Sequence, residues 1–148
     1  MLPDKTRSTL RTIMPATISS TQLPAPCAPS ATTLCLDDLP GDRRFAVTAD
    51  FEAPSSQGHG QAIPLGSLGV GRGGLFWFFS PDNPELLVKV LNACAINDRF
   101  WVFVSAGTNV GVTLRITDTL NGNAYTKVNP QGTPFPTLQD TVVGLPCP

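Results

Sequence analysis

Residues 75–91 read LFWFFSPDNPELLVKVL, and this stretch decides the fold. An aromatic run ends at a polar, proline-rich turn, and an aliphatic run follows the turn. Two apolar segments of strand length joined by turn residues are typical of a buried β-pair. The stretch therefore predicts how the domain is built, and it carries no pattern typical of catalysis.

Short apolar segments between turn signals continue on both sides of this pair. Residues 45–51 and 110–117 alternate apolar and polar side chains, and Asn121-Gly122 is the strongest hairpin signal in the chain. Pro64 restricts the short segment 61–65 to an edge position. With residues 100–104 and 124–128 added, the pattern predicts about seven or eight short strands and no helix. We expect an all-β fold, an antiparallel two-sheet sandwich of immunoglobulin-like or jelly-roll-like type, with a closed barrel as the main alternative.

The composition favours short strands joined by tight loops. Charged residues make up only 14% of the 148 residues, while 15 prolines and 13 glycines supply turns. The net charge of −1 gives no long-range attraction for nucleic acid, so we expect no nucleic-acid partner. No apolar run approaches the roughly 20 residues that span a bilayer, so we expect no membrane insertion. The first 20 residues also lack a continuous apolar segment, so we expect no secretory signal in this chain.

Two regions differ in composition. Residues 1–31 are rich in proline, serine and threonine and show no amphipathic period, which predicts an extended arm or linker, here called the N-terminal arm. Residues 32–148 carry the β pattern and end in an extended tail from residue 133. We therefore expect one sandwich domain preceded by the N-terminal arm.

The four cysteines are even in number and include no closely spaced pair, so disulfides are favoured over a zinc site. Three pairings are possible. We expect Cys35–Cys94 to link the two sheets and Cys27–Cys147 to join the two ends of the domain. Four buried thiols in a cytosolic protein are the alternative. Disulfides would place the protein outside the cell or on the surface of a particle.

The sequence also resembles a small β-rich domain that recurs in secreted bacterial proteins. The resemblance covers about residues 32–140 and includes the segments LCL at 34–36, FWFF at 76–79, VKVLNAC at 88–94, FWVF at 100–103, TDT at 117–119 and NPQGTPF at 129–135. Members of that family often have a tryptophan after the first strand, where this chain has Phe51. The resemblance implies an exported β-module without an assigned activity.

Candidate catalytic and ligand-binding patterns are weak, and we expect no catalytic residue and no cofactor. The segment GVGRGG at 69–74 matches G-x-G-x-x-G, but a β-run follows it where a nucleotide site needs a helix. His59, the single histidine, lies between two glycines and is expected to be an exposed loop residue. Asp37, Asp38 and Asp42 are weak candidates for calcium, because loops of β-sandwiches often supply oxygen ligands.

Aromatic side chains provide the candidate contact surface. Because side chains alternate along a strand, the run at 76–79 cannot all face one way. We expect Trp77 and Trp101 in the core and a contact surface formed by Phe76 and Phe78 with three residues of the arm, Leu23, Pro24 and Pro26. The expected function is a non-catalytic module of protein–protein assembly, such as a filament or coat subunit, which binds other protein subunits or itself through the N-terminal arm. The alternatives are a surface- or carbohydrate-binding accessory module of an exported enzyme and, less favoured, a hydrolase.

Overall fold

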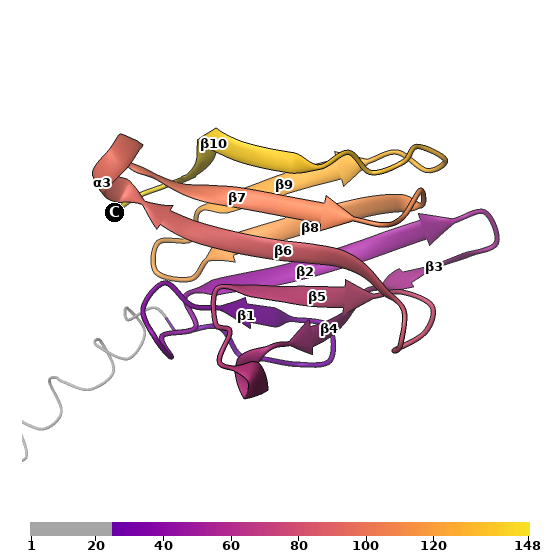
Figure 1. The fold of residues 1–148 in the computed structure, drawn as a ribbon, viewed down its shortest axis with the longest axis horizontal. Helices are drawn as coiled ribbons and strands as arrows, with labels where there is room; N and C mark the ends of the chain where they lie inside the picture. Colours follow the sequence, from indigo (N-terminus) through magenta and orange to yellow (C-terminus); the bar gives the residue numbers. More distant parts are fainter. Residues whose placement is uncertain (1–24) are drawn as a thin grey trace, which may run out of the picture.

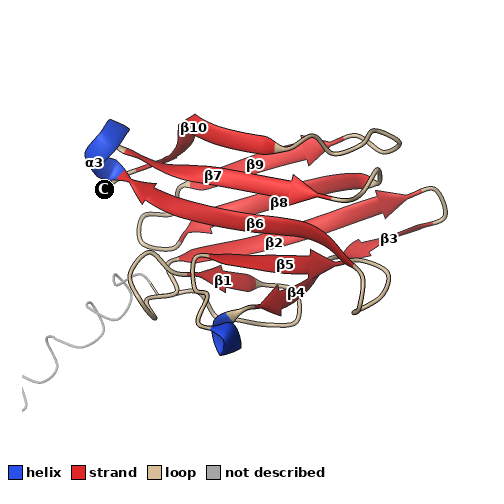
Figure 2. Ribbon diagram, in the orientation of Figure 1, coloured by secondary structure: helices blue, strands red, loops and turns tan. Residues whose placement is uncertain are grey.

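The computed structural model describes residues 25–148, which form two five-stranded antiparallel sheets packed face to face (Figure 1). Within residues 25–148, strands account for most of the backbone, and the two helices are each a single short turn (Figure 2). Sheet A has the order β1-β2-β8-β9, with β3 paired to the far half of β2, and comprises β1 (Leu34–Leu36), β2 (Phe45–Ala53), β3 (Ser56–His59), β8 (Gly111–Asp118) and β9 (Ala124–Asn129). Sheet B has the order β10-β7-β6-β5-β4 and comprises β4 (Gln61–Pro64), β5 (Gly73–Trp77), β6 (Pro84–Ala93), β7 (Arg99–Ala106) and β10 (Leu138–Pro146).

The chain crosses between the sheets three times. Strands β4 to β7 form one continuous meander, β8 and β9 return to sheet A, and β10 crosses back to pair with β7. The short helices η1 (Gly66–Leu68) and α3 (Cys94–Asn97) lie in the β4–β5 and β6–β7 connections. The predicted two-sheet sandwich is confirmed, and the barrel alternative is excluded because the two sheets do not join by hydrogen bonding into one.

The core lies between the sheets and follows directly from the alternation of side chains. In β2 every second residue from Phe45 to Ala49 is buried, and in β8 Val112, Leu114 and Ile116 are buried. Sheet B contributes the opposite wall through the buried side chains of Phe76, Leu86, Val88, Val90, Phe100, Val102 and Val104. The rings of Phe45 and Phe100 meet edge to face across the two sheets, with centroids 5.0 Å apart.

The described part of the N-terminal arm is held against the domain. The amide of Cys27 donates to the carbonyl of Arg43 at 2.9 Å, and the amide of Ala62 donates to the carbonyl of Ala31 at 2.8 Å. The second bond covers part of the outer edge of β4, an edge that would otherwise be open to pairing with another chain.

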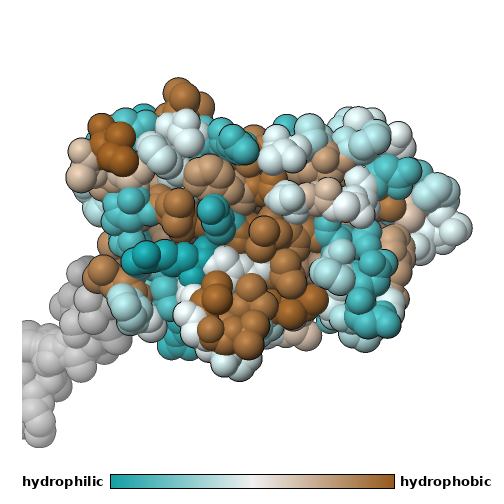
Figure 3. Space-filling model, viewed as in Figure 1, coloured by the Kyte–Doolittle hydropathy of each residue, from teal (hydrophilic) through white to brown (hydrophobic). Residues whose placement is uncertain are grey.

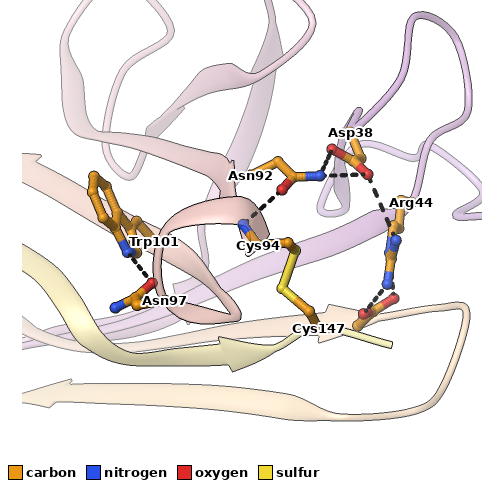
Figure 4. Close-up of a disulfide and its surroundings, with 8 residues drawn as sticks. Asp38, Arg44, Asn92, Cys94, Asn97, Trp101 and Cys147 are labelled. Carbon is orange, nitrogen blue, oxygen red and sulfur yellow. Dashed lines mark hydrogen bonds and ion pairs between the residues drawn. A yellow bond between two sulfur atoms is a disulfide. The ribbon is translucent and has the colours of Figure 1, made fainter.

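All four cysteines form disulfides, but the predicted pairing is wrong. The bonds are Cys27–Cys35 and Cys94–Cys147. Leu34 and Leu36 point into the core, so Cys35 between them points away from sheet B and cannot reach Cys94. Cys147 follows β10, whose pairing with β7 brings it to α3 and Cys94 (Figure 4).

Candidate contact surface

The outer face of sheet A is polar. Thr48, Asp50, Glu52, Thr113 and Arg115 lie on it, because their neighbours along β2 and β8 are the buried core residues. The register places Thr48 opposite Arg115 and Asp50 opposite Thr113. A face of this kind is typical of the solvent-facing side of an antiparallel sheet.

The outer face of sheet B is mostly apolar, and we call it the sheet B face. Cross-strand pairs connect its members, with Ile63 opposite Leu75, Leu75 opposite Leu87, and Leu91 opposite Trp101. In Figure 3 apolar side chains gather over β4, β5, β6 and η1 on this side of the molecule. The sheet B face consists of the outward residues of the sheet B strands. Most are apolar, namely Ile63, Leu75, Trp77, Leu87, Leu91, Trp101 and Phe103, and the polar residues Gln61, Lys89, Ser105 and Gln139 lie among them.

Several of these side chains are held in place by local contacts. The indole Nε1 of Trp101 donates to Asn97 Oδ1 at 3.0 Å (Figure 4). The Asn97 Nδ2 atom donates in turn to the carbonyl of Thr141 at 2.7 Å. The rings of Trp101 and Phe103 meet edge to face with centroids 6.5 Å apart. Leu87 is 41% exposed, although a leucine in a sheet is usually covered. These contacts fix the orientations of Trp101 and Phe103.

The predicted contact residues Phe76 and Phe78 are wrong, because both side chains are buried in the core. Their neighbours Trp77 and Phe79 are the more exposed residues, and neither Trp77 nor Trp101 is a core residue. The prediction that side chains alternate along this run is correct, but the inward and outward residues were assigned the wrong way round. Pro26 is exposed beside Cys27, whereas Leu23 and Pro24 lie outside the described residues.

His59 lies at the end of strand β3 and not in a loop. Its Nδ1 is 2.6 Å from Asp50 Oδ1, and the register places the two residues opposite each other. A carboxylate on Nδ1 fixes a histidine ring and leaves Nε2 free, which is an arrangement found in general bases. Here the side chains are 74% and 57% exposed, so water screens the pair strongly and the ring is not enclosed.

The carboxylates of Asp37, Asp38 and Asp42 are engaged by their own loop and its neighbours. Asp37 accepts from the amides of residues 41 and 43, and Asp42 accepts from the amides of residues 38, 39 and 44. Asp38 accepts from Asn92 and lies 3.6 Å from Arg44 (Figure 4). Among residues 25–148 no group of three or more acidic, histidine or cysteine side chains is placed to hold a metal ion.

Arg44 ties this loop to the core. Its guanidinium binds both carboxylate oxygens of Asp118 at 2.9 and 2.8 Å and lies 4.7 Å from the centre of the Phe100 ring. The Asp118 side chain is fully buried. The hydrogen bond to Asp118 raises the pKa of Arg44.

Tyr125 and Asp140 connect the sheets along the side formed by β9 and β10. The Tyr125 hydroxyl donates to Asp140 Oδ2 at 2.9 Å, and the amides of residues 142 and 143 donate to Asp140 Oδ1. Burial, followed by the hydrogen bond to Asp140, raises the pKa of Tyr125. Burial alone would raise the pKa of Asp140, but the amides and the tyrosine hydroxyl together lower it.

The glycine-rich segment leads directly into β5, as the sequence predicts. Gly71 and Arg72 bind the acidic loop: the carbonyl of Gly71 accepts from the amide of Asp37 at 2.8 Å, and the Arg72 guanidinium donates to the carbonyl of Asp38. The segment therefore joins two loops at one end of the sandwich.

No protein-family model matches the chain, and no curated protein or solved structure matches it either. The resemblance to a domain of secreted bacterial proteins therefore stays a prediction. The helices of the described region are all too short to cross a membrane. The two disulfides indicate an oxidising environment.

Proposed function

We propose that this protein is a non-catalytic β-sandwich module that assembles with another protein through the sheet B face, outside the cell or on the surface of a particle. The observation that carries this proposal is that the sheet B face is mostly apolar, whereas the outer face of sheet A on the opposite side of the sandwich is polar. A contiguous apolar patch of this kind marks an interaction surface in soluble proteins.

The size of the sheet B face suits such a role. Five strands spaced about 4.8 Å apart and averaging about seven residues cover about 550 Å². Covering this face with a matching surface would bury about 1,100 Å² in total, which reaches the lower limit for a specific interface. Tryptophan and phenylalanine are also among the residues enriched in protein interfaces.

A carbohydrate-binding module is the second candidate, and it competes for the same face. Trp101 and Phe103 could stack on sugar rings. Their planes are inclined at 68°, however, so they do not form the flat platform that a sugar ring would cover. This geometry favours a protein partner over a sugar ring.

Site-specific photocrosslinking in the cells that make the protein tests the proposal. A photoreactive phenylalanine analogue replaces Leu87 on the sheet B face, and in a control it replaces Val128, an exposed β9 residue on the outer side of sheet A. We expect a discrete cross-linked protein from position 87 and none from position 128. Equal products from both positions, or no product from position 87, would refute the assignment.

Self-association through the N-terminal arm is a separate route to assembly, and it depends largely on residues outside those described. Sedimentation velocity of the full chain and of a shortened chain beginning at Pro26 tests it. If the full chain assembles and the shortened chain does not, self-association through the arm is supported. If both chains are monomers, self-association through the arm is excluded.

A further inference from the structure

Lys89 occupies the centre of the sheet B face. Strand β6 is the middle strand of sheet B, with two strands on each side, and Lys89 lies near its midpoint. Its neighbours across the strands are Gly73 and Phe103. The ammonium group lies 4.8 Å from the centre of the Phe103 ring, so a positive charge stands amid apolar side chains.

A hollow of about 190 Å³ opens beside this charge. Two cross-strand rows form its floor, with Lys89, Phe103 and Gln139 in one row and Leu87 and Ser105 in the other. Thr137 stands at its rim, just before β10. The hollow thus has an apolar base and polar groups on several sides.

The polar groups of the hollow suit an anion. The lysine ammonium, the glutamine amide and the serine and threonine hydroxyls can all donate hydrogen bonds. Among the described residues no carboxylate lines the hollow, so none of the acidic residues at 25–148 competes for these donors within it. A carboxylate can accept hydrogen bonds from these donors. Such charge-assisted hydrogen bonds are stronger than hydrogen bonds between neutral groups.

We propose that this hollow receives an acidic side chain, flanked by apolar residues, of the partner protein. The inference rests on the proposed function and adds the chemistry of the partner to it. A second copy of this chain fits poorly as the partner. In a symmetric dimer with the greatest overlap of the two faces, the two-fold axis passes through the centre of the face. That arrangement would bring Lys89 against its own copy in a dry interface, where like charges repel strongly.

Two peptides differing in one group test the inference. Acetyl-leucyl-glutamyl-leucinamide and its neutral glutaminyl counterpart are titrated into the full chain, and backbone amide shifts are followed by NMR. We expect the acidic peptide to shift the signals of Leu87, Lys89, Phe103, Ser105 and Gln139. We expect it to bind about tenfold more tightly than the neutral peptide, because only the acidic one accepts a charge-assisted bond.

Two variants provide the matched comparison. Lys89→Met should reduce the affinity for the acidic peptide to that of the neutral one, whereas Arg115→Met removes a positive charge from the outer face of sheet A and should change nothing. Both positions are exposed, and an unaltered dispersion of amide signals verifies folding. Equal binding of both peptides at the hollow would overturn the carboxylate preference and leave the contact surface intact. If neither peptide shifts the amide signals of the residues that line the hollow, the inference is also overturned. The proposed function is tested separately by the photocrosslinking at position 87.

Discussion

The two disulfides should contribute unequally to stability, and the difference can be calculated from the chain they enclose. Cys94 and Cys147 are 53 residues apart, and Cys27 and Cys35 are 8 residues apart. In the loop-entropy account, closing the longer loop lowers the free energy of folding by about 4 kcal/mol, and closing the shorter one lowers it by about 2.5 kcal/mol. Removing the Cys94–Cys147 bridge should therefore cost about 1.5 kcal/mol more than removing the Cys27–Cys35 bridge.

Urea unfolding of the two double variants, Cys94→Ser with Cys147→Ser and Cys27→Ser with Cys35→Ser, measures this difference. Each variant is compared with the wild type, and the unfolding slope shows whether the denatured chain has expanded as the account requires. Cys27 is buried, so its replacement also costs packing energy, which reduces the expected difference in stability between the two double variants. A larger loss from the Cys27–Cys35 variant, or no change in slope for either, would refute the entropic reasoning.

Two further predictions concern packing and pH. A methyl group added at Gly74 would lie 2.6 Å from a methyl of Leu34 in the opposite sheet, so Gly74→Ala should lower stability in urea by about 1–3 kcal/mol, whereas Gly66→Ala, with open space around it, should not. Equal losses would exclude the clash as the cause. The pKa of Asp140 is lowered from 3.8 by folding, so its carboxylate stabilises the fold at higher pH and the free energy of unfolding should decrease as the pH drops below about 4. The pKa of Tyr125 is raised from 10.0 by folding, so its neutral hydroxyl stabilises the fold and the free energy of unfolding should also decrease above pH 10. Thermal unfolding across pH should show both slopes, and an unchanged acid slope in Asp140→Asn would contradict the assignment of the acid one.

Most strands could be predicted because their apolar residues alternate or cluster between clear turn signals. Strands β2, β4, β5, β6, β7, β8 and β9 form within a few residues of the expected positions. Strand β3 was not predicted, because its sequence from Ser56 to His59 is polar and reads as a turn. It forms because β2 extends beyond β1 and offers an unpaired edge to residues 56–59.

Strand β10 could not be predicted because an irregularity interrupts its alternation. Its register shifts between Asp140 and Leu145, and Val142 and Val143 are both exposed. A strand with a bulge presents two successive residues on one side, which removes the period that sequence reasoning depends on. Without β10, the position of Cys147 was unknown, and the disulfide pairing could not be deduced.

The outward residues of sheet B were only partly predictable for a related reason. The run from Leu75 to Phe79 is apolar at every position, so its sequence contains an alternation without indicating which side faces the core. Gly74 resolves the ambiguity in the structure, because only a residue without a side chain fits against Leu34. The inward side therefore includes Gly74 and Phe76, and Trp77 faces outward.

The order of the cysteines along the chain has a consequence for biosynthesis. Cys27 and Cys35 emerge first and lie close together, so they can oxidise while the rest of the chain is still being made. If this short-range bond forms before Cys94 emerges, Cys94 meets no free thiol upstream, and Cys147 is the partner left among the four cysteines. Synthesis in this order would favour the native pairing over the two alternatives.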